Sequence, residues 1–218
     1  KLAFMLSEAG NACGDVECVG IGLNDNFRYT AETLFNYSDG DFIDSLLTKK
    51  RDKFSHKGNY GHTLLICGSE GMAGAAFLAT GAALRSGCGY VTAMLPQEYI
   101  PALAAAYPSA LTIGEDADHF DKLPVNIDKY TSLAIGCGLG QHSRTIRVFE
   151  QLLDVYRRPM VIDADAINII SSNTALFGRI PNNSILTPHI GEFRRLVGSP
   201  ISLCTDLIDV CESGGGAP

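Results

Sequence analysis

Short apolar runs alternate with helix-length segments from residue 54 onward, and the runs end in glycine, aspartate or a turn. The strands predicted from these runs are Thr63–Cys67, Tyr90–Leu95, Ser132–Ile135, Met160–Ile162 and Ser184–Leu186. The predicted helices are Ala73–Ser86, Glu98–Ala106, Ser143–Tyr156 and Ser202–Cys211. Such alternation is typical of an α/β fold, in which a mostly parallel sheet carries helices on both faces.

The first 53 residues have a different pattern. Two short apolar runs, Leu2–Leu6 and Val16–Ile21, predict strands separated by a turn that contains glycine and serine. Because two isolated strands are marginal in water, they either join the following sheet or belong to a preceding domain. Residues 24–53 are polar and are interpreted as a linker, with Asp39-Gly40-Asp41 as a turn and Phe42–Leu47 as a short helix or strand.

Composition narrows the classes of partner. The 218 residues can bury one substantial core, and the net charge of −7 with scattered Lys and Arg argues against a nucleic-acid partner. The seven cysteines form no Cys-x-x-Cys pair, which favours reduced thiols and a cytoplasmic location. No apolar run is long enough to span a bilayer, so no membrane partner is expected. An anionic nucleotide would therefore need backbone N–H groups, helix N-termini or a metal ion.

Two glycine-rich loops each follow a predicted strand and precede a helix. Gly68, Gly71 and Gly74 do not have the spacing of the dinucleotide fingerprint, and no lysine completes a P-loop. Gly136-Cys137-Gly138-Leu139-Gly140 bares peptide N–H groups that could contact a diphosphate. Both loops predict a close approach of the backbone to a ligand; the alternative is that each is a tight turn.

Acidic and imidazole side chains follow the last two predicted strands. Asp163 and Asp165 could hold hydrated magnesium or order loop N–H groups, and one of them could instead be a helix N-cap. In Thr187-Pro188-His189-Ile190-Gly191-Glu192, Pro188 suits the opening of a helix. The spacing places His189 and Glu192 on one helical face, where they could meet one phosphate or one magnesium ion through water. The alternative is a capped surface helix with a solvated His189.

Six motifs occur in order from about His56 to Gly198. They are His56-Lys57-Gly58-Asn59-Tyr60-Gly61, Gly71-Met72-Ala73-Gly74-Ala75-Ala76, Ala83-Leu84-Arg85-Ser86-Gly87-Cys88-Gly89, Gly138-Leu139-Gly140, Asp163-Ala164-Asp165-Ala166 and Thr187-Pro188-His189-Ile190-Gly191-Glu192. Together these motifs resemble the ADP- or ATP-dependent NAD(P)H-hydrate dehydratases, which have a ribokinase-like fold. Residues 1–23 also resemble the last strands of the NAD(P)H-hydrate epimerase domain that precedes the dehydratase in bifunctional bacterial proteins. The resemblance implies an epimerase remnant (1–23), a linker (24–53) and a dehydratase domain incomplete at its C-terminus (54–218), with a three-layer αβα arrangement.

The resemblance also implies a repair reaction. Enzymes of this family phosphorylate the ring hydroxyl of hydrated NADH or NADPH from ADP or ATP, and loss of phosphate restores the reduced cofactor. The implied substrate-binding residues are Ala75, Gly138, Gly140 and His189. Asp163, Asp165 and Glu192 are implied to organise phosphate and metal, with Glu192 reaching Mg2+ through water. A homo-oligomer is also implied.

One departure from the family concerns catalysis. The family pattern continues with a Lys-Gly segment that holds the nucleotide and a Gly-Thr-Gly-Asp loop that supplies the catalytic base, and neither occurs in these residues. The base is therefore expected beyond Pro218, and the 218 residues alone are expected to bind substrate without turnover. Two alternatives stay open: a small-molecule kinase of the hydroxyethylthiazole or pyridoxal kinase type, in which Asn replaces His189, and a non-catalytic binding fragment.

Overall fold

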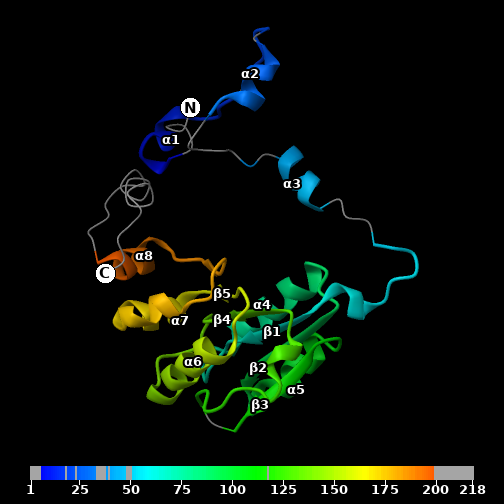
Figure 1. The fold of residues 1–218 in the computed structure, drawn as a ribbon, viewed down its shortest axis with the longest axis vertical. Helices are drawn as coiled ribbons and strands as arrows, with labels where there is room; N and C mark the ends of the chain where they lie inside the picture. The colour runs from blue at the N-terminus through cyan, green and yellow to red at the C-terminus, as the bar shows by residue number, and fades with distance from the viewer. Residues whose placement is uncertain are drawn as a thin grey trace. The chain divides into compact units, whose positions relative to one another are not determined.

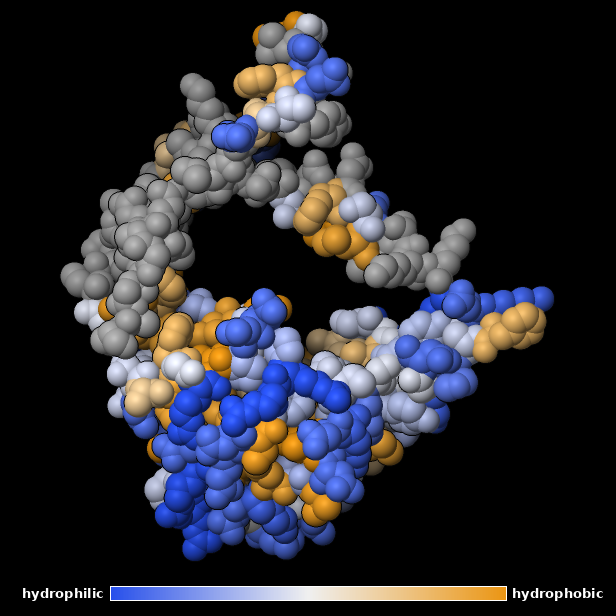
Figure 2. All heavy atoms as spheres, in the orientation of Figure 1, coloured by the Kyte–Doolittle hydropathy of each residue, from blue (hydrophilic) through white to orange (hydrophobic). Residues whose placement is uncertain are grey.

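The computed structural model describes residues 6–198 except 18, 23, 33–37, 39, 48–50 and 117. The described residues fall into two compact units, one before Phe54 and a larger one from Phe54 onward. The predicted helix Ser202–Cys211 and residues 2–5 of the first predicted strand lie outside the described residues. Figure 2 shows polar residues over much of the visible face of the larger unit, with apolar residues scattered among them.

The larger unit is built on a six-stranded, fully parallel sheet (Figure 1). Its strand order, β3-β2-β1-β4-β5-β6, reverses direction between β1 and β4, the kind of place where parallel α/β sheets bind ligands. The α/β prediction is confirmed. The strands are β1 (His62–Ile66), β2 (Tyr90–Pro96), β3 (Leu111–Glu115), β4 (Ser132–Ile135), β5 (Val161–Ile162) and β6 (Ile185–Leu186).

Helices cover both faces of the sheet, because alternate residues of each strand point to opposite sides. On β1, Leu64 and Ile66 pack into a core with side chains of α6 and α7, whereas Leu65 and Cys67 pack with side chains of α4 and α5. The helix α8 packs against α7. The helices are α4 (Ala73–Arg85), α5 (Ile100–Ala106), α6 (Ser143–Val155), α7 (Ala164–Ser172) and α8 (Ile190–Val197), with 3-10 turns η2 (Lys57–Tyr60), η3 (Gln97–Tyr99), η4 (Ile127–Lys129) and η5 (Thr174–Arg179).

The small residues of α4 let its first turn lie close to the end of β1. A Cβ at Gly68 would lie 2.9 Å from Cβ of Ala76, which is fully buried. Gly68 also has φ +78°, a conformation that side-chain-bearing residues rarely adopt. This close packing fixes the loop between β1 and α4 against the sheet.

Three sequence predictions in the larger unit were incomplete. The edge strand β3 was not predicted, because its apolar residues alternate with Thr112 and Gly114 instead of forming a run. For α7, the sequence predicted only a segment that follows an N-cap aspartate and runs through Asn168, which is the first part of the helix. The helix α8 begins at Ile190 with His189 as its N-cap, so Pro188 precedes the cap and does not occupy the first helical position.

The smaller unit contains the helices α1 (Ser7–Cys13), α2 (Asp25–Thr30) and α3 (Gly40–Leu47). The helix predicted as one option for Phe42–Leu47 is confirmed. The strand predicted at Val16–Ile21 is wrong for the residues described there, which form no strand. Val19 and Ile21 are 72% and 76% exposed, and the described part of this unit offers no strand with which their backbone could pair.

None of the described helices has the length and apolar character needed to cross a membrane. The assignment of residues 24–53 as a linker and the domain boundaries stay predictions.

Candidate functional site

The two glycine-rich loops lie against each other at the carboxyl edge of the sheet, where its strand order reverses. The N–H of Gly68 donates to the carbonyl oxygen of Cys137 at 3.0 Å, and the N–H of Ser69 donates to that of Gly138 at 2.6 Å. These bonds join the loop after β1 to the loop after β4. The sequence predicted two separate loops whose backbone could contact a phosphate. In the structure the two loops form one surface.

Ala75 and Gly138 are neighbours on this surface, although 63 positions separate them in the sequence. A Cβ built at Gly138 would lie 3.0 Å from Cβ of Ala75 and 3.1 Å from the carbonyl oxygen of Met72. Gly138 has φ +59° and Gly140 has φ +73°, so both positions favour glycine. The loop therefore presents backbone, without side chains of its own at these two positions.

The acids after β5 hold the loop after β4 in place. Oδ2 of Asp165 accepts the Gly140 N–H at 2.9 Å. Oδ2 of Asp163 accepts the Cys137 thiol at 3.1 Å, and Oδ1 accepts the Thr187 hydroxyl at 2.8 Å. Asp163 is the N-cap residue of α7, but its side chain makes no capping bond. Both acids thus order neighbouring loops, which is one of the roles the sequence left open.

Cys137 is a neutral thiol in this arrangement. Burial, reinforced by the hydrogen bond to Asp163 and by that carboxylate's charge, raises its pKa to about 12. A thiol with such a pKa is a poor nucleophile at neutral pH. Its role here is that of a hydrogen-bond donor to Asp163, consistent with the sequence-based assignment of no chemistry to the cysteines.

His189 and Glu192 form a reciprocal capping box at the start of α8. Nδ1 of His189 accepts the Gly191 N–H at 2.9 Å, while Oε2 of Glu192 accepts the His189 backbone N–H at 2.9 Å. The second carboxylate oxygen, Oε1, lies 3.3 Å from Nε2 of His189. Glu192 is 5% exposed, whereas the His189 side chain is 68% exposed. The capped-helix alternative therefore describes the local structure of this motif.

Most of the predicted site residues are linked by direct contacts. Ala75 packs beside Gly138, whose loop continues to Gly140, and the Gly140 N–H donates to Asp165. Asp163 in turn accepts the hydroxyl of Thr187, two residues before His189. Within the described part of the chain, the hydrogen bonds of the His189 ring and backbone all go to residues of α8. His189 is thus near these residues in sequence but is not joined to Ala75 or Gly138 by a hydrogen bond.

The acidic side chains described above do not form a magnesium-binding site. Among the described residues, no three His, Cys, Asp or Glu side chains are grouped as metal ligands. Glu192 is committed to the start of α8, and Asp163 and Asp165 are committed to neighbouring donors. These residues do not fit a protein-held ion, and a role for Mg2+ stays a prediction.

Sequence reasoning missed two side chains that shape the site. Thr187 bridges β6 to Asp163, and the hydroxyl of Tyr99 accepts the Gly71 N–H at 3.3 Å from another segment. A polar residue directly after a predicted strand is the signal that could have singled out Thr187. Tyr99 offered no such signal, because its partner is 28 residues away.

The sequence profile of the NAD(P)H-hydrate dehydratase family matches residues 63–213 of this chain. The chain belongs to this family. The bifunctional NAD(P)H-hydrate repair enzyme Nnr of Moorella thermoacetica is 31% identical over 207 residues, covering 91% of this chain and 39% of that protein. The ADP-dependent (S)-NAD(P)H-hydrate dehydratase of Neisseria meningitidis serogroup B is 37% identical over 158 residues, covering 71% and 51%. The chain therefore spans roughly two fifths to half of the length of these relatives.

Solved structures agree on the fold. A ribokinase-like superfamily protein from Enterococcus faecalis superposes with a TM-score of 0.62 at 24% identity, covering 75% of this chain and 58% of that one. The ADP/ATP-dependent NAD(P)H-hydrate dehydratase of Bacillus subtilis, co-crystallised with ATP/Mg2+, gives a TM-score of 0.62 at 32% identity, covering 75% and 56%. The predicted ribokinase-like fold is confirmed for the larger unit.

Proposed function

We propose that this chain binds hydrated NADH or NADPH for a dehydratase that uses ADP or ATP as the phosphoryl donor. The observation that carries the proposal is the joined surface of the two glycine loops, where Ala75 and Gly138 pack without room for a larger side chain. The named relatives support a dehydratase over a small-molecule kinase of the same fold.

The chemistry of the family is phosphoryl transfer followed by elimination. The ring hydroxyl of the hydrated cofactor gives its proton to a general base while its oxygen bonds to the terminal phosphorus of the nucleotide, and the bond from that phosphorus to the donor nucleotide breaks. The new C–O–P group then loses phosphate, which takes the electrons of the C–O bond, and loss of a ring proton completes the double bond. Positioning and electrostatic stabilisation supply most of the rate in such transfers.

In this scheme the described residues bind and position. The glycine loops let a dinucleotide approach the peptide backbone, whose N–H groups favour anionic phosphates. Asp165 holds the loop at Gly140, and Asp163 connects that loop to the strand end that leads to His189. We propose His189, exposed at the start of α8, as a contact to the bound dinucleotide.

Magnesium would neutralise phosphate charge if it accompanies the nucleotide. The described acids do not form a site that would hold the ion by themselves. We predict a cytoplasmic location, because the cysteines are expected to be reduced and the proposed substrate is a small metabolite. A homo-oligomer is likewise predicted from the family resemblance.

The test measures binding of hydrated NADPH to the 218-residue chain by titration calorimetry. Gly138→Ala adds one Cβ against Ala75 and Met72 at a position with φ +59°, and we expect at least about tenfold weaker binding. Gly178→Ala is the matched control, because a Cβ there meets nothing within 4 Å and Gly178 lies in η5, outside both glycine loops. Binding by this control should stay within about twofold of the parent chain.

A second variant separates loss of binding from loss of folding. Asn is a good N-cap residue, so His189→Asn should preserve α8 while removing the imidazole. We expect it to weaken binding of hydrated NADPH about tenfold with an unchanged melting temperature. If both Gly138→Ala and His189→Asn bind hydrated NADPH as tightly as the parent chain, the proposal is wrong.

A further inference from the structure

An acidic hollow lies at the β2–β3 end of the sheet edge. It includes Glu70 of the first glycine loop but none of the proposed substrate contacts Ala75, Gly138, Gly140 and His189. Its volume is about 420 Å3, within the range of small-molecule pockets. Among the described residues, Pro96 and Gln97 line it together with five acidic side chains, and none of these described lining residues is basic. The acidic residues are Glu70, Glu98, Glu115, Asp116 and Asp118.

Glu115 is the feature that distinguishes this hollow from an ordinary acidic surface. It is 3% exposed, and its Oε1 has no hydrogen-bond partner among the described residues although the residue lines the hollow. Buried polar atoms are nearly always paired, and a buried carboxylate oxygen without a donor is costly. A ligand that brings a hydrogen-bond donor and a positive charge would satisfy this atom.

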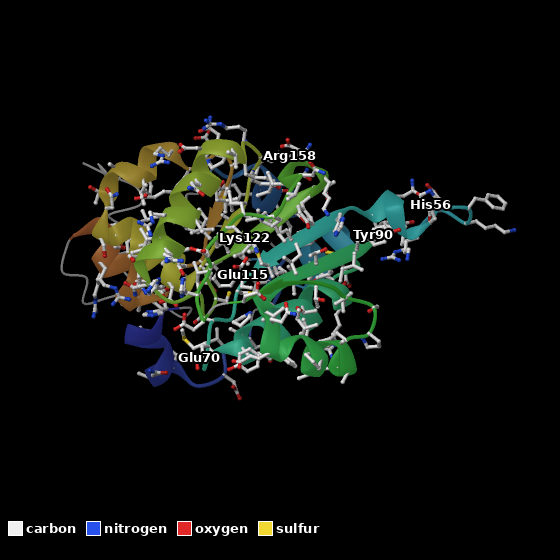
Figure 3. The ribbon with its side chains drawn as sticks, turned by 90° about the horizontal axis from the view of Figure 1, so that it is seen from below. His56, Glu70, Tyr90, Glu115, Lys122 and Arg158 are labelled. Carbon is white, nitrogen blue, oxygen red and sulfur yellow. The ribbon has the colours of Figure 1, made fainter. Side chains whose placement is uncertain are left out.

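The groups around Glu115 do not already provide that charge. A backbone hydrogen bond from Asp121 reaches its carboxylate, and Lys122 exerts an attractive Coulomb field. Within the described residues, Lys122 forms no ion pair with Glu115, and it lines a neighbouring, mostly apolar hollow of about 280 Å3. Figure 3 labels Glu70, Glu115 and Lys122, which come from the loop after β1, the end of β3 and the segment after β3.

The arrangement of the acids indicates the class of cation. No three of the described acidic or other ligating side chains are grouped closely enough to hold one metal ion. The carboxylates instead line a hollow of about 420 Å3 from several segments, the loop after β1 and the ends of β2 and β3, so separate ammonium groups could each meet a carboxylate. Pro96 and the adjoining apolar hollow, which Glu115 also lines, offer contact for the methylene groups between them.

We propose that this acidic hollow binds a small aliphatic diamine or polyamine, with one ammonium group donating to Oε1 of Glu115. A second ammonium group would lie among the exposed carboxylates of Glu98, Asp116 and Asp118. The hydrogen bond from His119 to Asp118 lowers the pKa of Asp118, so this carboxylate is charged at neutral pH. The ligand would relieve the repulsion among these acids.

The experiment titrates 1,4-diaminobutane into the 218-residue chain at pH 7.5 and low salt, with calorimetry and melting temperature as readouts. We expect saturable binding that raises the melting temperature. Glu115→Gln keeps the shape of the side chain and should weaken binding about tenfold. Glu98→Lys places an ammonium group at the hollow and should weaken it at least as much. Asp128→Asn changes an exposed acid outside the hollow and should leave binding unchanged.

Two further titrations identify the ligand class. Butylamine, with a single ammonium group, should bind at least about tenfold more weakly than 1,4-diaminobutane. Magnesium chloride at equal ionic strength should not reproduce the stabilisation. The proposal is overturned if Glu115→Gln binds the diamine as the parent chain does, or if butylamine or magnesium binds equally well. Hydrated NADPH binding is read separately, so failure here does not depend on the function proposed above.

Discussion

Glu115 shows how one side chain can reduce the stability of the fold that contains it. Burial is the main cause that raises its pKa, while the Asp121 amide and the Lys122 charge oppose that rise. One of its oxygens stays without a partner in the buried state. A carboxylate with these surroundings binds its proton more tightly in the folded chain than in the unfolded chain.

The stability of the chain should therefore depend on Glu115 in a defined pH range. Because the folded pKa lies above the unfolded one, the contribution of Glu115 is fully present below the unfolded pKa and is lost as pH rises through the folded pKa. We expect Glu115→Gln to raise the free energy of unfolding by about 1 kcal/mol at pH 8 and to have little effect near pH 4. Thermal unfolding across this range measures it, with Glu98→Gln as an exposed control. A variant less stable than the parent chain at pH 8 would contradict the prediction.

His189 and the two aspartates mark what residue spacing could and could not foresee. A separation of three residues was enough to predict that His189 and Glu192 meet, but they meet in a capping box, because His189 is the N-cap of α8 and does not lie on its helical face. Residue spacing does not show whether the two side chains bind a ligand or bind each other. That depends on whether N–H groups at the start of α8 already occupy their lone pairs. Asp163 and Asp165 are similar, since their partners Thr187 and Gly140 come from other segments.

Elements with strong local signals were predicted well, and elements without them were not. The strands before the two glycine loops were found because an unbroken apolar run precedes each glycine, Leu64–Cys67 before Gly68 and Leu133–Ile135 before Gly136. The edge strand β3 was missed because Thr112 and Gly114 interrupt its apolar positions and Leu111 is 49% exposed. Its place beside β2 depends on tertiary packing, which outweighs local propensity at such positions.

The capping box of α8 allows a test at the scale of the element. Glu192→Ala removes the acceptor of the His189 N–H, and we expect a loss of about 1 kcal/mol in the stability of α8. Glu192→Gln keeps an acceptor oxygen and should lose less than half of that amount. Amide hydrogen exchange along α8 measures both, since local opening of the helix exposes its N–H groups. Equal exchange rates in the two variants would mean that the carboxamide does not replace the cap.

The order of the strands is a property of the whole molecule that the linear pattern did not contain. Alternating strands and helices predicted a parallel sheet, but nothing in them specified that β1 pairs with both β2 and β4. The pairing Thr63 with Ser132 joins residues 69 positions apart. The contact of Ala75 with Gly138 follows from it, and the family resemblance could name both residues without giving their geometry.

The division into two compact units predicts which residues control the main unfolding transition. Ile135 is 2% exposed in the core of the larger unit, so Ile135→Asp should abolish cooperative unfolding by burying a charge. Val19 and Ile21 in the smaller unit are 72% and 76% exposed, so the same change at both should alter the main transition by no more than about 0.5 kcal/mol. Calorimetric melting of the 218-residue chain distinguishes these cases, with Val148→Asp as a second core substitution because Val148 is 3% exposed. A large loss of stability from the Val19 and Ile21 substitutions would show that the sheet depends on these residues for its stability, against the division into units.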